Sequence, residues 1–129
     1  RTANGVVKGK VAYLSPEVID GAAPDRRADV FALGTSLWEM SVDRRLFKQE
    51  NDVETVRAIH NAKIPDPRTL VPNYPDALWA VLSRALERDV ALRYPTAAEM
   101  SRALDACVEV NGRTVNNMSV AAMMAQLSA

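Results

Sequence analysis

Few residues of this chain are of a type that could carry out acid–base, nucleophilic or metal chemistry. His60 is the single histidine and Cys107 the single cysteine among 129 residues. A metal site needs several closely spaced ligands, and a Ser-His-Asp site needs a histidine positioned by an acid. We therefore expect a solvated His60, a small buried Cys107, and neither a metal site nor a nucleophilic site.

Phosphate chemistry and nucleic-acid binding also lack their usual signals. The sequence contains no Gly-x-Gly-x-x-Gly and no Gly-Lys-Ser/Thr motif, the loops whose backbone N–H groups hold nucleotide phosphates. Lys+Arg and Asp+Glu number 16 each, so the formal net charge is zero and no field attracts nucleic acid or an anionic membrane. Charges interrupt every apolar run, so we expect no membrane segment.

The spacing of apolar residues predicts an all-α fold of about five helices. A short helix begins at Ser15-Pro16, where a hydroxyl cap precedes a proline. Helices capped by Asp25 and Asp52 extend to about Val42 and Ala62. Two more begin at Pro75 and at Thr96, and the last ends near Gly112. Residues 1–14 read as a glycine-punctuated loop or short strand, and residues 119–127 as a short apolar helix.

The helix after Asp25 is expected to lie at the centre of the molecule. Its apolar residues, which run from Val30 to Met40, cover much more than one face. Gly34 in its interior costs about 1 kcal/mol relative to alanine, which indicates a close approach by a neighbouring backbone. Asp29 stands at the start of this apolar stretch, and an unpaired buried carboxylate is expensive, so it needs a partner.

Read in order, three motifs resemble the protein kinase catalytic domain from its activation segment onward. Residues 9–17 (GKVAYLSPE) resemble the end of that segment, and residues 25–34 (DRRADVFALG) the start of the central helix of the large lobe. LERD at 86–89, followed by RYPT at 93–96, resembles the loop before the last helix. The resemblance covers about residues 1–110 and is closest in style to bacterial Ser/Thr kinases.

The resemblance assigns roles to several residues. Glu17 and Arg93 match a buried ion pair that ties the activation segment to the helical subdomain. Asp29 matches the carboxylate that holds the catalytic loop. Gly9, Lys10 and Tyr13 match the substrate-docking loop, in which Lys10 replaces the usual threonine. Glu39 matches a position that recognises a basic substrate residue in some kinases, and Thr2 lies where activating phosphorylation often occurs.

The same resemblance implies that the chain is the C-terminal part of the large lobe, with residues 1–112 forming the partial lobe and 113–129 a tail. The glycine-rich loop, lysine, metal-binding residues and catalytic aspartate precede this region in kinases, so ATP and Mg belong to the intact parent. The first residue is Arg1 rather than Met, as in a fragment. The expected parent is a cytoplasmic Ser/Thr protein kinase, and this segment alone is expected to lack catalysis and to bind no cofactor.

A rival hypothesis is a non-catalytic helical interaction module, derived from a pseudokinase, that uses the helix from Asp52 to bind partners. The Lys10 replacement favours this rival, whereas the set of Glu17, Asp29 and Arg93 favours the kinase. The expected partners are a protein substrate and the remainder of the kinase domain. Because the central helix would normally be surrounded, a free segment is also expected to self-associate through exposed apolar surface.

Overall fold

The computed structural model describes residues 11–61 and 63–111 of the chain, and within these ranges it contains helices and no strand. The prediction of an all-α fold is therefore confirmed. Along the described residues, five α-helices and three single 3-10 turns follow one another. They are η1 (Val11–Tyr13), α2 (Pro16–Ile19), α3 (Arg26–Val42), α4 (Asp52–Asn61), η2 (Pro67–Thr69), α5 (Asp76–Ala85), η3 (Val90–Leu92) and α6 (Ala97–Asn111).

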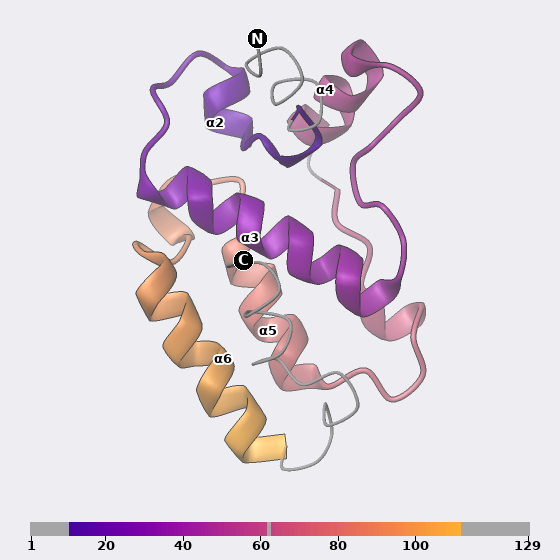
Figure 1. Ribbon diagram of the computed structural model, residues 1–129, viewed down its shortest axis with the longest axis vertical. Helices are drawn as coiled ribbons and strands as arrows, with labels where there is room; N and C mark the ends of the chain where they lie inside the picture. Colours follow the sequence, from indigo (N-terminus) through magenta and orange to yellow (C-terminus); the bar gives the residue numbers. More distant parts are fainter. Residues whose placement is uncertain (1–10, 62, 112–129) are drawn as a thin grey trace, which may run out of the picture.

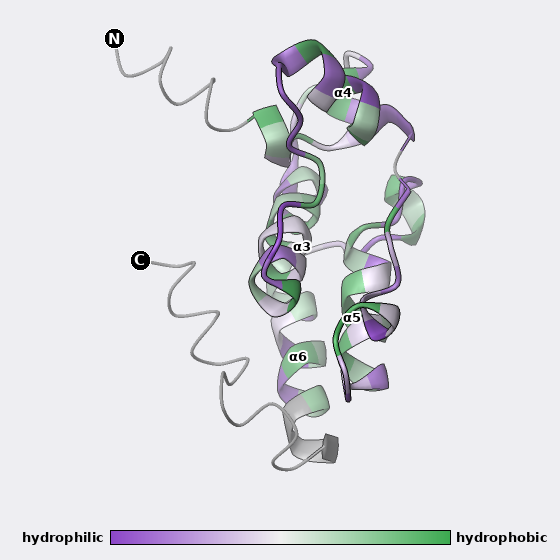
Figure 2. Ribbon diagram, turned by 90° about the vertical axis from the view of Figure 1, so that its right-hand side faces the viewer, coloured by the Kyte–Doolittle hydropathy of each residue, from purple (hydrophilic) through white to green (hydrophobic). Residues whose placement is uncertain are grey.

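Helix α3 crosses the middle of the molecule, as expected for the central helix (Figure 1). Helices α5 and α6 pack against it and against each other, while α4 contacts η1 and α2 instead. In both views α4 lies at one end, beyond α3 (Figures 1 and 2). The core therefore forms where α3, α5 and α6 meet. Its largest buried apolar side chains are Phe31, Leu37, Trp38, Phe47, Ile59, Leu82, Met100 and Leu104.

Polar groups within α3 are satisfied despite their burial. The Thr35 hydroxyl donates to the Phe31 carbonyl at 3.0 Å, and the Trp38 indole N–H donates to the Pro65 carbonyl at 3.2 Å. The second bond fixes the irregular segment before α5 against the central helix. Phe47, which follows α3, stacks on Phe31 with a ring separation of 5.8 Å and anchors the connection to α4. These contacts keep α3 free of unpaired buried groups along its core face.

Two of the helix caps predicted from the sequence are present, and a third is at a different residue. Asp25 caps α3, since its Oδ1 accepts the Arg27 N–H at 2.8 Å, and Thr96 caps α6 through the Glu99 N–H at 3.1 Å. The prediction that Asp52 caps α4 is wrong. Asp52 is the first residue of the helix, and Asn51 caps it by accepting the Glu54 N–H at 2.9 Å.

Two further expectations are corrected at η1 and α2. Residues 11–13, expected as a loop or short strand, form a 3-10 turn. Ser15 stands at the N-cap position of α2, but its hydroxyl makes no capping hydrogen bond. In α4 the buried residues are Thr55 and Ile59, whereas Val53 is 65% exposed. The elements that α4 contacts most are the short η1 and α2, which fits its narrow buried stripe. The helix expected over residues 119–127 lies outside the described residues.

Gly34 lies where α3 meets the end of α5. A Cβ atom at this position would stand 2.9 Å from the Cβ of Ala85 and 3.3 Å from two side-chain carbons of Leu86. The first distance is shorter than carbon–carbon contacts allow, and the Ala85 Cβ cannot move without its backbone. The close approach expected from the sequence is therefore present.

We predict that Gly34→Ala destabilises the protein. Overpacking costs about 1–3 kcal/mol, and it is offset by only about 1 kcal/mol of helix propensity. Urea unfolding followed by circular dichroism should show a lower midpoint, with a net loss of up to about 2 kcal/mol in the free energy of unfolding. Ser36→Ala, at a half-buried position of the same helix, is the control and should stay within about 0.5 kcal/mol. A more stable Gly34→Ala variant would contradict the prediction.

Candidate functional site: a buried arginine and the face beside Tyr13

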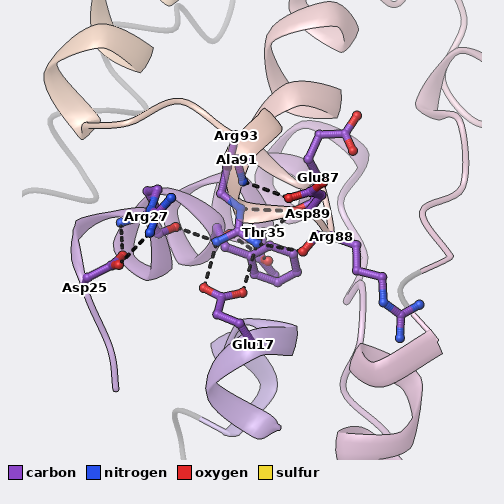
Figure 3. A network of polar contacts seen from close by, with 10 residues as sticks. Glu17, Asp25, Arg27, Thr35, Glu87, Arg88, Asp89, Ala91 and Arg93 are labelled. Carbon is purple, nitrogen blue, oxygen red and sulfur yellow. Dashed lines mark hydrogen bonds and ion pairs between the residues drawn. The ribbon is translucent and has the colours of Figure 1, made fainter. Parts of the chain in front are cut away.

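The structure brings Glu17 and Arg93 together although 76 positions separate them (Figure 3). The Arg93 Nη1 donates to Glu17 Oε2 at 2.9 Å, and its Nη2 donates to Glu17 Oε1 at 3.0 Å. The Arg93 side chain has no exposed surface, and that of Glu17 is 19% exposed. Two parallel, charge-assisted hydrogen bonds of this kind are both strong and specific in orientation.

Arg93 also binds backbone carbonyl groups from two other segments. Its Nε and Nη2 donate to the Glu87 carbonyl at 3.0 and 2.8 Å, and its Nη1 donates to the Arg27 carbonyl at 2.8 Å. The guanidinium carbon lies 5.1 Å from the centre of the Phe31 ring. A single side chain therefore joins α2, the first turn of α3 and the loop between α5 and η3.

The ionisation of Glu17 depends on this arrangement. Burial by itself would raise the pKa of the Glu17 carboxyl, but hydrogen bonds from Arg93 and from a backbone N–H outweigh it. As a result the pKa of Glu17 lies below its ordinary value of 4.5, and the carboxylate stays charged at neutral pH.

A second contact joins η1 to α3. The Tyr13 hydroxyl donates to Glu39 Oε1 at 2.6 Å, and the Leu46 N–H donates to Glu39 Oε2 at 2.9 Å. Burial, followed by the hydrogen bond to Glu39, raises the pKa of the Tyr13 phenol above 10.0. The Arg45 Nε lies 3.5 Å from Glu39 Oε2. The carboxylate proposed to recognise substrate is thus already bound by groups of its own chain.

These groups border a hollow of about 550 Å³ at the C-terminal half of α3. Its walls include the side chains of Ser36 and Met40 and the residues that follow the helix. The complete lining is Tyr13, Ser36, Glu39, Met40, Asp43, Arg44 and Arg45. The hollow is a candidate contact surface for a polypeptide, because it offers charged, hydroxyl and apolar groups side by side.

The remaining residues proposed for function are not joined to either contact. Asp29 is exposed in the first turn of α3, and no hydrogen bond or ion pair reaches its side chain from the described residues. The partner expected for Asp29 is therefore absent from this part of the chain. Thr2, Gly9 and Lys10 lie outside the described residues.

Sequence reasoning missed the anchor of α4. Arg88 donates through Nη2 to the His60 carbonyl and through Nη1 to the Asn61 carbonyl at 3.4 Å, which satisfies the C-terminal end of the helix. The His60 Nδ1 in turn lies 3.3 Å from Asp20 Oδ1 at the end of α2. No sequence signal could have identified the carbonyl groups bound by Arg88, because every residue supplies one.

Two kinds of site are not found among residues 11–61 and 63–111. In this part of the chain no three His, Cys, Asp or Glu side chains gather in a way that could hold a metal ion. None of the helices described is long and apolar enough to cross a membrane.

We predict that Glu17→Ala is strongly destabilising. The substitution leaves the Arg93 guanidinium buried without its counter-charge, a change that costs about 3 kcal/mol or more. Urea unfolding at pH 7 should show this loss. Glu54→Ala is a matched control, because Glu54 pairs with Arg57 at 3.3 Å on the exposed surface of α4, where such pairs contribute about 0.5 kcal/mol. Equal losses in the two variants would contradict a special role of the buried pair.

Acid should weaken the fold through the same carboxylate. The pKa of Glu17 is about 4.5 when unfolded and lower when folded, so its contribution is complete above pH 4.5 and is lost as the pH falls through the folded value. Glu17→Gln should be less stable than wild type at pH 7, and the difference should narrow below pH 4.5. Unfolding curves at a series of pH values measure this, and a constant difference down to pH 2 would contradict it.

The chain was compared with family models and with curated proteins. No family model matches it. It is 43% identical over 104 residues to the tyrosine-protein kinase MasK of Myxococcus xanthus, a match that covers 81% of this chain and 16% of that protein. It is 31% identical over 120 residues to the serine/threonine-protein kinase PknK of Mycobacterium tuberculosis, covering 91% of this chain and 11% of the relative.

A third relative is the serine/threonine-protein kinase PrkC of Bacillus subtilis, 32% identical over 94 residues, or 73% of this chain and 14% of PrkC. The chain thus spans less than a fifth of the length of these three proteins. The matches agree with the all-helical fold around α3 and with the order of the three motifs. Together they identify the chain as a segment of the bacterial protein kinase family, corresponding to the C-terminal part of the large lobe.

Proposed function

We propose that this chain docks protein substrate and supports the lobe within a Ser/Thr protein kinase, whose intact form transfers phosphate from Mg-ATP to protein hydroxyls. The segment itself would not be catalytic, because the groups that bind nucleotide and metal lie elsewhere in the parent. The observation that carries the proposal is the bidentate Glu17–Arg93 pair, which joins segments 76 positions apart. The resemblance to kinases implies an ion pair between these two residues, and the pair is present.

The exposure of Asp29 also supports the kinase hypothesis. In the intact parent this carboxylate would accept hydrogen bonds from the catalytic loop, which would then occupy the face that Asp29 presents to solvent. In an isolated interaction module the same carboxylate would serve only as an acid in the first turn of α3, where it interacts favourably with the helix dipole. Tyr13, with Gly9 and Lys10, would form the docking loop for substrate, and Thr2 would be the site of activating phosphorylation.

The substrate class of the parent, the cellular location of the segment and the boundary between lobe and tail are also proposals. The names of the relatives include both a tyrosine kinase and serine/threonine kinases, and we assign the parent to the second group because of the motif style around Glu17 and Arg93. We propose a cytoplasmic location for this segment. Residues 1–112 would belong to the lobe and 113–129 to a tail.

The rival function is a non-catalytic helical module that binds partners through α4. The exposure of Val53, at 65%, is the observation that favours it, since this side chain could contribute apolar contact to a partner. The isolated segment would also self-associate if the face of α3 that carries Leu33 and Met40 were left open. The interaction module has no catalytic loop, so Asp29 would have no role in its function. In the kinase, Asp29 would be needed to hold that loop.

The deciding experiment assays the full-length gene product and the 129-residue chain for transfer of labelled γ-phosphate from ATP to protein. We expect transfer by the full-length product and none by the chain. Asp29→Asn in the full-length product should lower kcat at least about tenfold. In the 129-residue chain the same substitution should shift the free energy of unfolding by no more than about 1 kcal/mol, because the side chain has no partner among the described residues.

Asp105→Asn is the matched control, since Asp105 is exposed on α6 and lies outside the three motifs, and kcat of this variant should be unchanged. The intact mass of the native product is measured alongside. A product of only 129 residues, or a full-length product that transfers no phosphate, would exclude the kinase function and leave the interaction module.

A further inference from the structure

Glu39 is a nearly buried carboxylate at the edge of the hollow beside Tyr13, with 11% of its side chain exposed. Two of its contacts are short hydrogen bonds from groups with little freedom. The Tyr13 hydroxyl donates to one oxygen at 2.6 Å and the Leu46 backbone N–H to the other at 2.9 Å. These bonds fix the orientation of the carboxylate, but both donors are neutral, so neither cancels its charge.

The cation that cancels this charge is Arg45, and it is held loosely. Its Nε lies 3.5 Å from Glu39 Oε2, and its side chain is 54% exposed. Only the Arg45 member of this pair is solvated, and holding an exposed arginine in one geometry costs side-chain entropy that offsets part of the Coulomb gain. A second guanidinium or ammonium group could therefore take the place of Arg45 at Oε2 without disturbing the two short bonds.

The hollow gives such a group access to the carboxylate. Glu39 and Arg45 both line it, together with the Ser36 hydroxyl and the thioether of Met40. Arg44 lines it as well, and no ion pair or hydrogen bond reaches the Arg44 side chain from the described residues. An incoming basic side chain must therefore displace one arginine of this chain and pass near another.

We propose that Arg45 is a specificity-determining residue that occupies Glu39 and makes this surface disfavour a basic side chain of the bound polypeptide. Without Arg45, the Glu39 carboxylate faces the hollow with its orientation fixed and its charge uncompensated, and it becomes a receptor for arginine. The identification of the bound polypeptide as a kinase substrate rests on the proposed function. The competition between Arg45 and an external guanidinium does not.

The test measures binding of a short peptide to the 129-residue chain. The probe is acetyl-Ala-Ala-Arg-Ala-Ala-amide, and the same peptide with glutamine in place of arginine is the uncharged comparison. Nuclear magnetic resonance titration follows the side-chain signals of Tyr13 and Glu39. In wild type the peptide must first displace Arg45 from Glu39, which costs about 1 kcal/mol of binding free energy. We therefore expect Arg45→Ala to bind the arginine peptide about fivefold more tightly than wild type. Binding of the glutamine peptide should not change.

Two further variants separate specificity from a structural effect. Arg44→Ala is the matched control on the same rim, and it should leave the ratio between the two peptides within about twofold of wild type, since Arg44 does not contact Glu39. Glu39→Gln combined with Arg45→Ala should abolish the gain, because the amide keeps acceptor capacity but carries no charge. Tight binding of the arginine peptide by wild type, or no gain in Arg45→Ala, including no binding by either, overturns the proposal.

The same variants in the full-length product relate the result to the proposed function. If that product phosphorylates peptides, Arg45→Ala should raise kcat/KM for one arginine-containing peptide of a positional set about fivefold, mainly through KM. A change in kcat alone for all peptides would indicate a structural effect and count against the proposal. A full-length product without kinase activity would refute the proposed function, whereas the peptide-binding result would still decide the role of Arg45.

Discussion

The buried guanidinium of Arg93 is the interaction on which the arrangement of the other elements depends. Removing an arginine from water costs several kcal/mol, and only a nearly complete set of acceptors makes this tolerable. Arg93 finds these acceptors in the Glu17 carboxylate and in the carbonyl groups of Glu87 and Arg27. The three groups come from three different segments, and the geometry of one planar cation fixes their relative positions.

This dependence extends to parts of the molecule that Arg93 does not touch. The loop that supplies the Glu87 carbonyl also carries Arg88, whose side chain binds the last carbonyl groups of α4. The α2 turn held through Glu17 directly follows η1, where Tyr13 reaches Glu39 on α3. The position of α4 and that of the face beside Tyr13 are thus linked to the same buried charge, through short runs of backbone.

The sequence predicted those features that depend on the type of residue at a position. The apolar breadth of α3 placed it at the centre, and Gly34 marked its close contact with α5. The pairing of Glu17 with Arg93 was inferred by resemblance, since no local pattern relates residues so far apart. The sequence did not predict contacts in which a side chain binds a backbone carbonyl, as Arg88 does at the end of α4. It also could not decide between two adjacent residues that are both able to cap a helix. Asn51 and Asp52 are both residue types that cap helices well. Asn51 is the cap of α4 because the backbone becomes helical at Asp52.

The arrangement also explains why a charged pair would be retained where an apolar one could be more stable. Well-packed hydrophobic residues often replace buried ion pairs without loss of stability. An apolar side chain at position 93 could fill the space, but it could not bind the Arg27 carbonyl, which lies in the first turn of α3 two residues before Asp29. The direction in which Asp29 leaves the helix is set by that turn. In the proposed kinase, where Asp29 must meet the catalytic loop, the buried arginine therefore contributes accuracy of placement, and this contribution does not depend on whether the pair adds to the free energy of unfolding.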